Sequence, residues 1–191
     1  MCTDTVLVHH AVAKKFTSTL HHLTTYMPNH QAHLMTSKSR ANIDHLLKDA
    51  EQKGATLIQA DGSLSDGNLI PVTLIDNVRD GMVYNTTESF GPLLAIRHFA
   101  SEEEVLNYFH ESGFGLSSSV FSKNHLRAIN FARKLDVGAV HINAGSVHDE
   151  GNFPHGGNGL SGFGRFGGAW ALREFTRTKT VMVYPDESQE A

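Results

Sequence analysis

Residues 139–175 read AVHINAGSVHDEGNFPHGGNGLSGFGRFGGAWALREF, a short apolar run followed by a segment rich in glycine, histidine and adjacent carboxylates. The apolar run predicts a strand, and glycine gives the segment after it backbone conformations that other residues resist. Loops placed in this way by a strand often carry binding and catalytic residues. We therefore expect the functional site in this stretch. Its polar side chains are His141, His148, Asp149, Glu150 and His155.

The stretch also divides into short motifs, which are HIN at 141–143, VHDE at 147–150, SGFGRFGG at 161–168 and EFT at 174–176. In this order they resemble the end of the aldehyde dehydrogenase catalytic domain, particularly the salicylaldehyde, benzaldehyde and vanillin dehydrogenase branch. Further matching motifs are TDTVLV at 3–8, ESFGP at 88–92 and FGLSSSVF at 114–121. The resemblance covers nearly the whole chain, and it implies the α/β fold of that catalytic domain.

The resemblance also implies that parts of the family's catalytic machinery precede this chain. In the family, the nucleophilic cysteine lies immediately before the position of Met1, so Cys2 is not its equivalent. The nucleotide-binding domain, the asparagine that helps to hold the oxyanion and the glutamate that activates water precede that position as well. We therefore expect no NAD-dependent oxidation by this chain alone, and NAD(P) as a cofactor only if an N-terminal domain is supplied.

Length, composition and charge exclude several classes of protein. With 191 residues, of which 40% are hydrophobic and 19% charged, the chain is expected to form one domain with a sizeable core. A net charge of −4 argues against nucleic acid as a partner, because proteins that bind phosphate backbones carry clustered positive charge. No apolar stretch approaches the roughly 20 residues that cross a bilayer, and no secretory signal is recognisable, so we expect a cytoplasmic protein without membrane contact.

Metal and disulfide chemistry are also not expected. The single cysteine excludes an intrachain disulfide and supplies no thiolate cluster for zinc. Histidine is abundant, with 13 residues, but the pairs at 9–10 and 21–22 lack the spacing of a metal-binding HExxH motif. The sequence therefore predicts no metal site.

Apolar, β-branched runs alternate with amphipathic stretches along most of the chain. Strands are predicted at residues 5–8, 56–59, 69–75, 93–99, 117–121, 139–142 and 178–184. Helices are predicted at residues 11–23, 37–53, 126–135 and 170–175, and from a capping box at 101–104 to near Gly113. Strands separated by helices of this length indicate parallel pairing with right-handed crossovers. We therefore expect an α/β parallel-sheet domain of the aldehyde dehydrogenase catalytic type, without the nucleotide-binding domain.

Residues 1–184 are expected to form this domain, and residues 185–191 a mobile acidic tail. In the resembling family, the strand that corresponds to residues 178–184 takes part in a sheet between subunits. Association would also cover an otherwise unpaired apolar strand edge. We therefore predict a homo-oligomer, most simply a dimer, with residues 178–184 as the oligomerisation strand.

The resemblance assigns two residues of the ESFGP motif to the cofactor. Glu88 corresponds to the glutamate that holds the nicotinamide ribose, and Phe90 corresponds to the aromatic residue near the nicotinamide ring. Without a nucleotide-binding half, both positions are expected to be vestigial. The alternative for Glu88 is an ordinary surface carboxylate, and for Phe90 an anchor before a turn.

His155 departs from the family pattern, because the family has a phenylalanine there that lines the aldehyde tunnel. A histidine can act as a general acid or base near neutral pH, and an adjacent carboxylate can raise its basicity. We therefore predict His155 as the catalytic group, with His148, Asp149 and Glu150 as its partners. The residues predicted to bind substrate are His141, Asn143 and Phe153.

Three functions remain open on this evidence. The chain is the C-terminal piece of an NAD(P)-dependent aromatic aldehyde dehydrogenase, a noncatalytic partner of a complete relative, or a protein whose carbonyl pocket serves non-redox acid-base chemistry. The last would condense, cyclise or isomerise a small molecule such as an aromatic aldehyde or ketone. The sequence favours it because an acid-base residue, His155, stands in the pocket.

Overall fold

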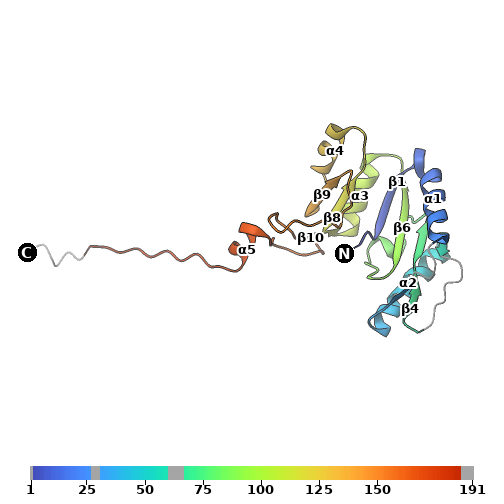
Figure 1. The fold of residues 1–191 in the computed structure, drawn as a ribbon, viewed down its shortest axis with the longest axis horizontal. Helices are drawn as coiled ribbons and strands as arrows, with labels where there is room; N and C mark the ends of the chain where they lie inside the picture. Colours follow the sequence, from blue (N-terminus) through green and yellow to red (C-terminus); the bar gives the residue numbers. More distant parts are fainter. Residues whose placement is uncertain (1, 27–30, 60–66, 186–191) are drawn as a thin grey trace, which may run out of the picture.

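The main sheet has the strand order β1-β6-β5-β3 in the computed structural model, which describes residues 2–26, 31–59 and 67–185 (Figure 1). Its strands are β1 (Thr5–His9), β6 (Leu93–Phe99), β5 (Thr73–Asp76) and β3 (Thr56–Gln59). The central strand β6 pairs in parallel with both of its neighbours, β1 and β5. The predicted α/β fold with a parallel core is therefore confirmed.

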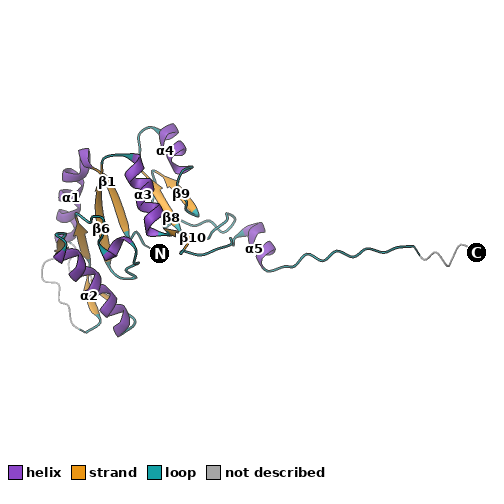
Figure 2. Ribbon diagram, turned by 180° about the vertical axis from the view of Figure 1, so that it is seen from behind, coloured by secondary structure: helices purple, strands orange, loops and turns teal. Residues whose placement is uncertain are grey.

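Helices pack on both faces of this sheet, and Figure 2 shows them in purple around the strands. The helices are α1 (His10–Thr25), α2 (Ser37–Gln52) and α3 (Glu102–Ser112). Successive residues of a strand point to opposite faces. On β6, Ala95 packs into the cluster formed with α2, whereas Ile96 packs against Ala13 of α1. The sheet therefore separates two apolar layers.

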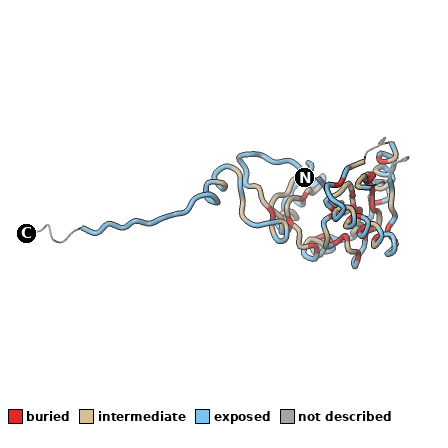
Figure 3. Tube along the Cα trace, turned by 90° about the horizontal axis from the view of Figure 1, so that it is seen from below, coloured by how far each residue is buried: buried red, intermediate tan, exposed pale blue. Residues whose placement is uncertain are grey.

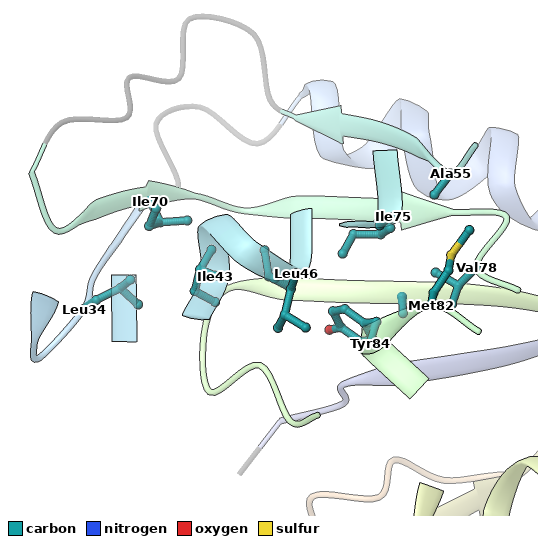
Figure 4. Packing of buried hydrophobic residues seen from close by; sticks show 12 residues of the cluster. Leu34, Ile43, Leu46, Ala55, Ile70, Ile75, Val78, Met82 and Tyr84 are labelled. Atoms are coloured by element: carbon teal, nitrogen blue, oxygen red, sulfur yellow. The ribbon is translucent and has the colours of Figure 1, made fainter. Parts of the chain in front are cut away.

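The larger apolar layer lies between α2 and the sheet (Figure 4). Ile43, Leu46 and Ala50 recur at helical spacing on α2, and all three are fully buried. They meet Ile75 from β5 and Tyr84 from the short 3₁₀ helix η1 (Val83–Asn85). This layer ties the segment that contains Glu88 to the core, because η1 lies immediately before it.

A second, smaller unit of structure carries the glycine-rich stretch. β8 (Ser117–Val120) pairs in parallel with β9 (Ala139–Ile142), and α4 (His125–Ala132) makes the crossover between them. β7 (Phe114–Gly115) pairs antiparallel with β10 (Asn158–Gly159), and α5 (Gly168–Glu174) follows. The glycine-rich segment thus leaves the end of β9 and returns to the domain at β10.

The expectation of parallel pairing does not hold for three strand pairs, which are β3–β5, β7–β10 and the pair of β2 (Gln31–His33) with β4 (Leu69–Pro71). β3 runs antiparallel to β5, and the described part of the chain between them, residues 67–72, holds β4 and no crossover helix of the kind that parallel pairing needs. The extended run predicted at 69–75 is split into β4, which pairs with β2, and β5. Pro71 has no N–H to donate, so it suits the end of a short strand with one partner.

The chain after α5 leaves the domain. Residues 176–185 run outward as an extended segment, exposed along its length (Figure 3). In the part of the chain that the structure describes, this segment pairs with no other strand. A strand needs a partner for its backbone groups, so a single chain does not test the oligomerisation strand predicted at 178–184, which stays a prediction. Residues 186–191 of the predicted mobile tail lie outside the described residues.

None of the helices in the described residues is long and apolar enough to cross a membrane.

Candidate functional site

β9 ends at Ile142, and Asn143 then turns the chain into the glycine-rich segment. Its backbone lies in the left-handed region, with φ of 57°, which asparagine tolerates better than most residues. Its side-chain Oδ1 accepts a hydrogen bond from Ser122 N–H at 2.8 Å, and its Nδ2 donates to Ser122 O at 3.0 Å. Asn143 borders a surface hollow of about 430 Å³, together with Phe121 and Lys123. Both polar atoms of its amide are nevertheless engaged in holding the turn.

The carboxylates of the VHDE motif pair with two different histidines. His148 Nε2 lies 2.9 Å from Glu150 Oε1, and His155 Nδ1 lies 3.3 Å from Asp149 Oδ1. The first pair is largely exposed, whereas the His155 side chain is only 19% exposed. A carboxylate that contacts one ring nitrogen of an imidazole orients the ring. The structure thus brings together the four residues predicted as catalytic, as two separate pairs.

His155 is held by its backbone as well as by Asp149. His155 and Phe166 exchange both backbone hydrogen bonds, at 2.8 and 2.9 Å, and their rings lie 5.1 Å apart. Arg165, which immediately precedes Phe166, donates to the carbonyl oxygens of Gly157 and Gly164. These hydrogen bonds link the two ends of the segment 157–164. This bridge fixes the position of the His155 ring relative to Phe166.

His155 also lines a cavity of about 390 Å³. Phe163 and Phe166 of the SGFGRFGG motif line it together with Arg165, and Phe163 is 99% exposed. Glu174 of α5 and Ser161 add polar groups. The aromatic rings offer an apolar surface to a small aromatic molecule, beside the polar side chains of His155, Arg165 and Glu174.

The residues predicted to bind substrate are distributed differently. His141 lies within β9 with its Nε2 buried, and no described residue supplies a hydrogen-bond partner for that atom. Its ring stands edge-on to the ring of His148, 6.4 Å away, so the two histidines are adjacent. Phe153 is largely exposed and follows Glu150 by a turn. Neither His141 nor Phe153 is among the residues that line the cavity of His155.

Glu88 and Phe90 are exposed on the surface of the domain, and in the sequence they lie far before the histidine pairs. Phe90 has a left-handed φ of 47° and is 82% exposed, an unusual combination for an aromatic residue. Glu88 is exposed overall, but partial burial of its carboxyl group, together with the negative charge of Asp4, raises the pKa of Glu88. Backbone outliers of this kind are maintained where the surroundings enforce them, often at functional sites.

The surroundings of this loop include residues that the sequence did not mark as functional. Ser89 donates to Asp4 at 2.7 Å, and the Asn42 amide lies 3.3 Å from the carbonyl oxygen of Glu88. Asp4 stands before β1 and Asn42 on α2, so neither contact is visible from spacing along the chain. Among the residues that the structure places, no group of three or more His, Cys, Asp or Glu side chains could hold a metal ion.

Comparison with known proteins shows which family this chain resembles. The model of the aldehyde dehydrogenase family matches residues 1–181. Salicylaldehyde dehydrogenase from Pseudomonas putida is 35% identical over 156 residues, which are 82% of this chain and 32% of that enzyme. Vanillin dehydrogenase from Pseudomonas fluorescens is 36% identical over 150 residues, which are 78% of this chain and 31% of that enzyme.

Solved structures agree with the sequence comparison. The crystal structure of a salicylaldehyde dehydrogenase from Pseudomonas putida G7 complexed with salicylaldehyde matches 97% of this chain and 40% of that chain, with a TM-score of 0.87 and 29% identity. The NADP complex of glyceraldehyde-3-phosphate dehydrogenase from Bacillus halodurans C-125 matches with a TM-score of 0.84 and 32% identity, over 91% of this chain and 38% of that chain. The chain spans about a third of the length of the curated relatives it matches. It belongs to the aldehyde dehydrogenase family.

Proposed function

We propose that this chain supplies the nicotinamide-ribose contact and part of the substrate-tunnel wall of an NAD(P)-dependent dehydrogenase of aromatic aldehydes. The observation that carries the proposal is the Glu88–Phe90 loop. It holds the Phe90 ring outward in a strained backbone conformation, and the Glu88 carboxylate accepts no hydrogen bond from any other described residue. The similarity to the salicylaldehyde complex supports the choice of substrate class.

The loop suits the ribose end of a nicotinamide nucleotide. A ribose presents two adjacent hydroxyl donors, and an ionised carboxylate accepts more than one hydrogen bond. The exposed ring of Phe90 offers an apolar surface beside that carboxylate. When bound, the nicotinamide ring accepts a hydride from the substrate. Glu88 would orient that group, and the exposed rings of Phe163 and Phe166 would offer an apolar surface to the aldehyde.

The covalent step of the family chemistry needs a nucleophilic thiolate. Cys2 is the one cysteine of this chain, and it is exposed and lies past the family position of the nucleophile. The oxidation is therefore proposed for an assembly in which the other two thirds of the family fold are present. In that assembly, this chain contributes binding and orientation.

A chimera tests the proposal directly. The matching segment of Pseudomonas putida salicylaldehyde dehydrogenase is replaced by this chain, and NADH formation from salicylaldehyde is followed by absorbance. We expect turnover, and we expect Glu88→Gln in the chimera to raise the KM for NAD because one acceptor of the ribose hydroxyls is weakened. Gly145→Ala, at an exposed position with nothing within 4 Å of the added methyl group, is the matched control. A folded chimera that binds salicylaldehyde but forms no NADH contradicts the proposal.

A second candidate function rests on the 3.3 Å contact between His155 and Asp149. This pair lies at a cavity and contains a half-exposed carboxylate beside a largely buried imidazole, which is the arrangement of a general acid or base. It supports the non-redox reactions of a carbonyl compound, namely condensation, cyclisation or isomerisation. The two functions differ in their cofactor, since the second proceeds without NAD(P).

Either function is proposed for a homo-oligomer. The exposed apolar side chains of the C-terminal segment support this proposal, because an uncovered extended segment of this kind is a ready template for strand pairing. They are Val181, Met182, Val183 and Tyr184.

A further inference from the structure

The loop that presents Glu88 and Phe90 is fastened to the start of β1 by a single carboxylate. Asp4 Oδ1 accepts a hydrogen bond from Ser89 Oγ at 2.7 Å and another from the Tyr84 hydroxyl at 3.2 Å. Ser89 and Tyr84 are 3% and 2% exposed, so both donors are removed from water. Hydrogen bonds to an ionised acceptor are shorter and stronger than neutral ones, and the 2.7 Å bond from Ser89 is the shorter of the two.

The other side of the loop is fixed by α2. The Asn42 amide donates to the carbonyl oxygen of Glu88 at 3.3 Å and lies 3.5 Å from that of Ser89. Gly91 packs so closely against Ile43 that an added methyl group would lie 2.4 Å from its Cδ1 atom. Two segments that lie far from the loop in the sequence, the start of β1 and α2, therefore hold it. Their contacts keep Glu88 and Phe90 on the outside of the domain.

We propose that Asp4 is a positioning residue for Glu88, which fixes the loop through Ser89 and keeps a negative charge beside the Glu88 carboxylate. This inference rests on the proposed contact between Glu88 and the nicotinamide ribose. Partial burial first and the charge of Asp4 second raise the pKa of Glu88. Burial and the charge of Asp4 also raise the pKa of Tyr84, so the tyrosine keeps its proton and remains a donor to Asp4.

Two substitutions separate the hydrogen bond from the charge. Asp4→Asn keeps an acceptor oxygen but removes the charge, and Ser89→Ala removes the donor but keeps the charge. The full chain is studied by NMR, with hydrogen exchange of the amides of residues 88–91 and 93 and with titration of the Glu88 side chain, assigned by Glu88→Gln. Asp44→Asn, an exposed carboxylate on α2 that contacts Arg40, is the matched control.

We expect Ser89→Ala to speed exchange of the loop amides about tenfold, because a hydrogen bond to a charged group is lost. We expect Asp4→Asn to lower the titration midpoint of Glu88 toward the ordinary value of about 4.3. An Asp4 whose charge does not act on the Glu88 carboxyl would not move that midpoint. Unchanged exchange in Ser89→Ala together with an unchanged midpoint in Asp4→Asn overturns the proposal.

Nicotinamide mononucleotide serves as the probe for the proposed ligand, detected by saturation transfer to the full chain. We expect it to bind the wild type and to bind Asp4→Ala more weakly by about tenfold, a loss of the size expected when a charge-assisted hydrogen bond that orders a loop is removed. If the wild type does not bind it, the role of Glu88 falls, and that of Asp4 with it. If the wild type binds it, and Asp4→Ala and Asp4→Asn both bind it as tightly as the wild type does, only the Asp4 proposal falls.

Discussion

Replacing Gly91 with alanine tests the packing that holds the Glu88 loop against α2. The added methyl group would lie 2.4 Å from Ile43 Cδ1 and 3.2 Å from Ile43 Cγ1. Ile43 is fully buried in the core cluster, so a shift of its side chain is expected to disturb the packing of its neighbours. Overpacking of this kind costs about 1–3 kcal/mol. We therefore expect Gly91→Ala to lower the free energy of unfolding by that amount, measured by urea denaturation.

The clash identifies the substitution that relieves it. Ile43→Val removes Cδ1, the atom at 2.4 Å, and by itself costs about 0.5–1.5 kcal/mol. In the double variant the two changes share the same space, so their costs are expected not to add, with a favourable coupling of about 1 kcal/mol. Gly145→Ala is the control, because nothing lies within 4 Å of its added methyl group, and a change within about 0.5 kcal/mol is expected.

Two results would refute this reasoning. Equal stability of Gly91→Ala and the wild type would show that the loop can retreat from α2 at no cost. Strict additivity with Ile43→Val would show that the destabilisation does not arise from the contact between these two residues. Either result would also argue against the inference that contacts with α2 hold the Glu88 loop in its conformation.

The isolated chain is expected to form no NADH from NAD and benzaldehyde above a denatured control, because its one cysteine lies past the nucleophile position; turnover that Cys2→Ala abolishes would contradict this. If an acid-base substrate is found, His155→Ala is expected to lower the rate by about 10²- to 10⁴-fold. Full activity of His155→Phe, with no ionisation between about pH 5 and 8 in the wild type, would assign His155 to packing alone. Light scattering at micromolar concentration is expected to give at least the mass of a dimer, and loss of residues 178–191 is expected to abolish it; a monomer mass for the full chain counts against the oligomer. Burial acts to raise the pKa of Asp49, but hydrogen bonds, first that with Lys53, outweigh it and lower that pKa. Its stabilising contribution is therefore present above the ordinary carboxyl pKa and lost as pH falls through the lowered one, so Asp49→Asn is expected to flatten the loss of stability in acid, and an unchanged acid limb would disprove it.

Local signals were sufficient to predict much of the fold. The strands at 56–59, 93–99 and 139–142 lie at their predicted positions, and Ser101 caps α3 as its sequence indicates. In each case the pattern acts within a few residues. The antiparallel β3 and the division of 69–75 depend on which strands lie side by side, and that is decided by contacts far apart in the chain.

The same distinction applies to the candidate site. The VHDE motif predicts a cluster of polar groups, but not that His148 pairs with Glu150 while Asp149 pairs with His155. Asp4 reaches Ser89 across most of the N-terminal half of the chain, and no spacing rule describes such a contact. Residues that hold a loop in place are thus the part of a site that a single sequence shows least.

The extended segment after α5 has a practical consequence. Arg177 and Lys179 are exposed on it, and an extended, accessible backbone is the form that proteases cut. Trypsin should remove the end of the chain from a free subunit while the folded domain survives. A strand paired with a neighbouring subunit would escape the enzyme. Brief digestion followed by mass spectrometry therefore measures the fraction of chains that keep their C-terminal segment. That fraction is the share of associated subunits in the sample.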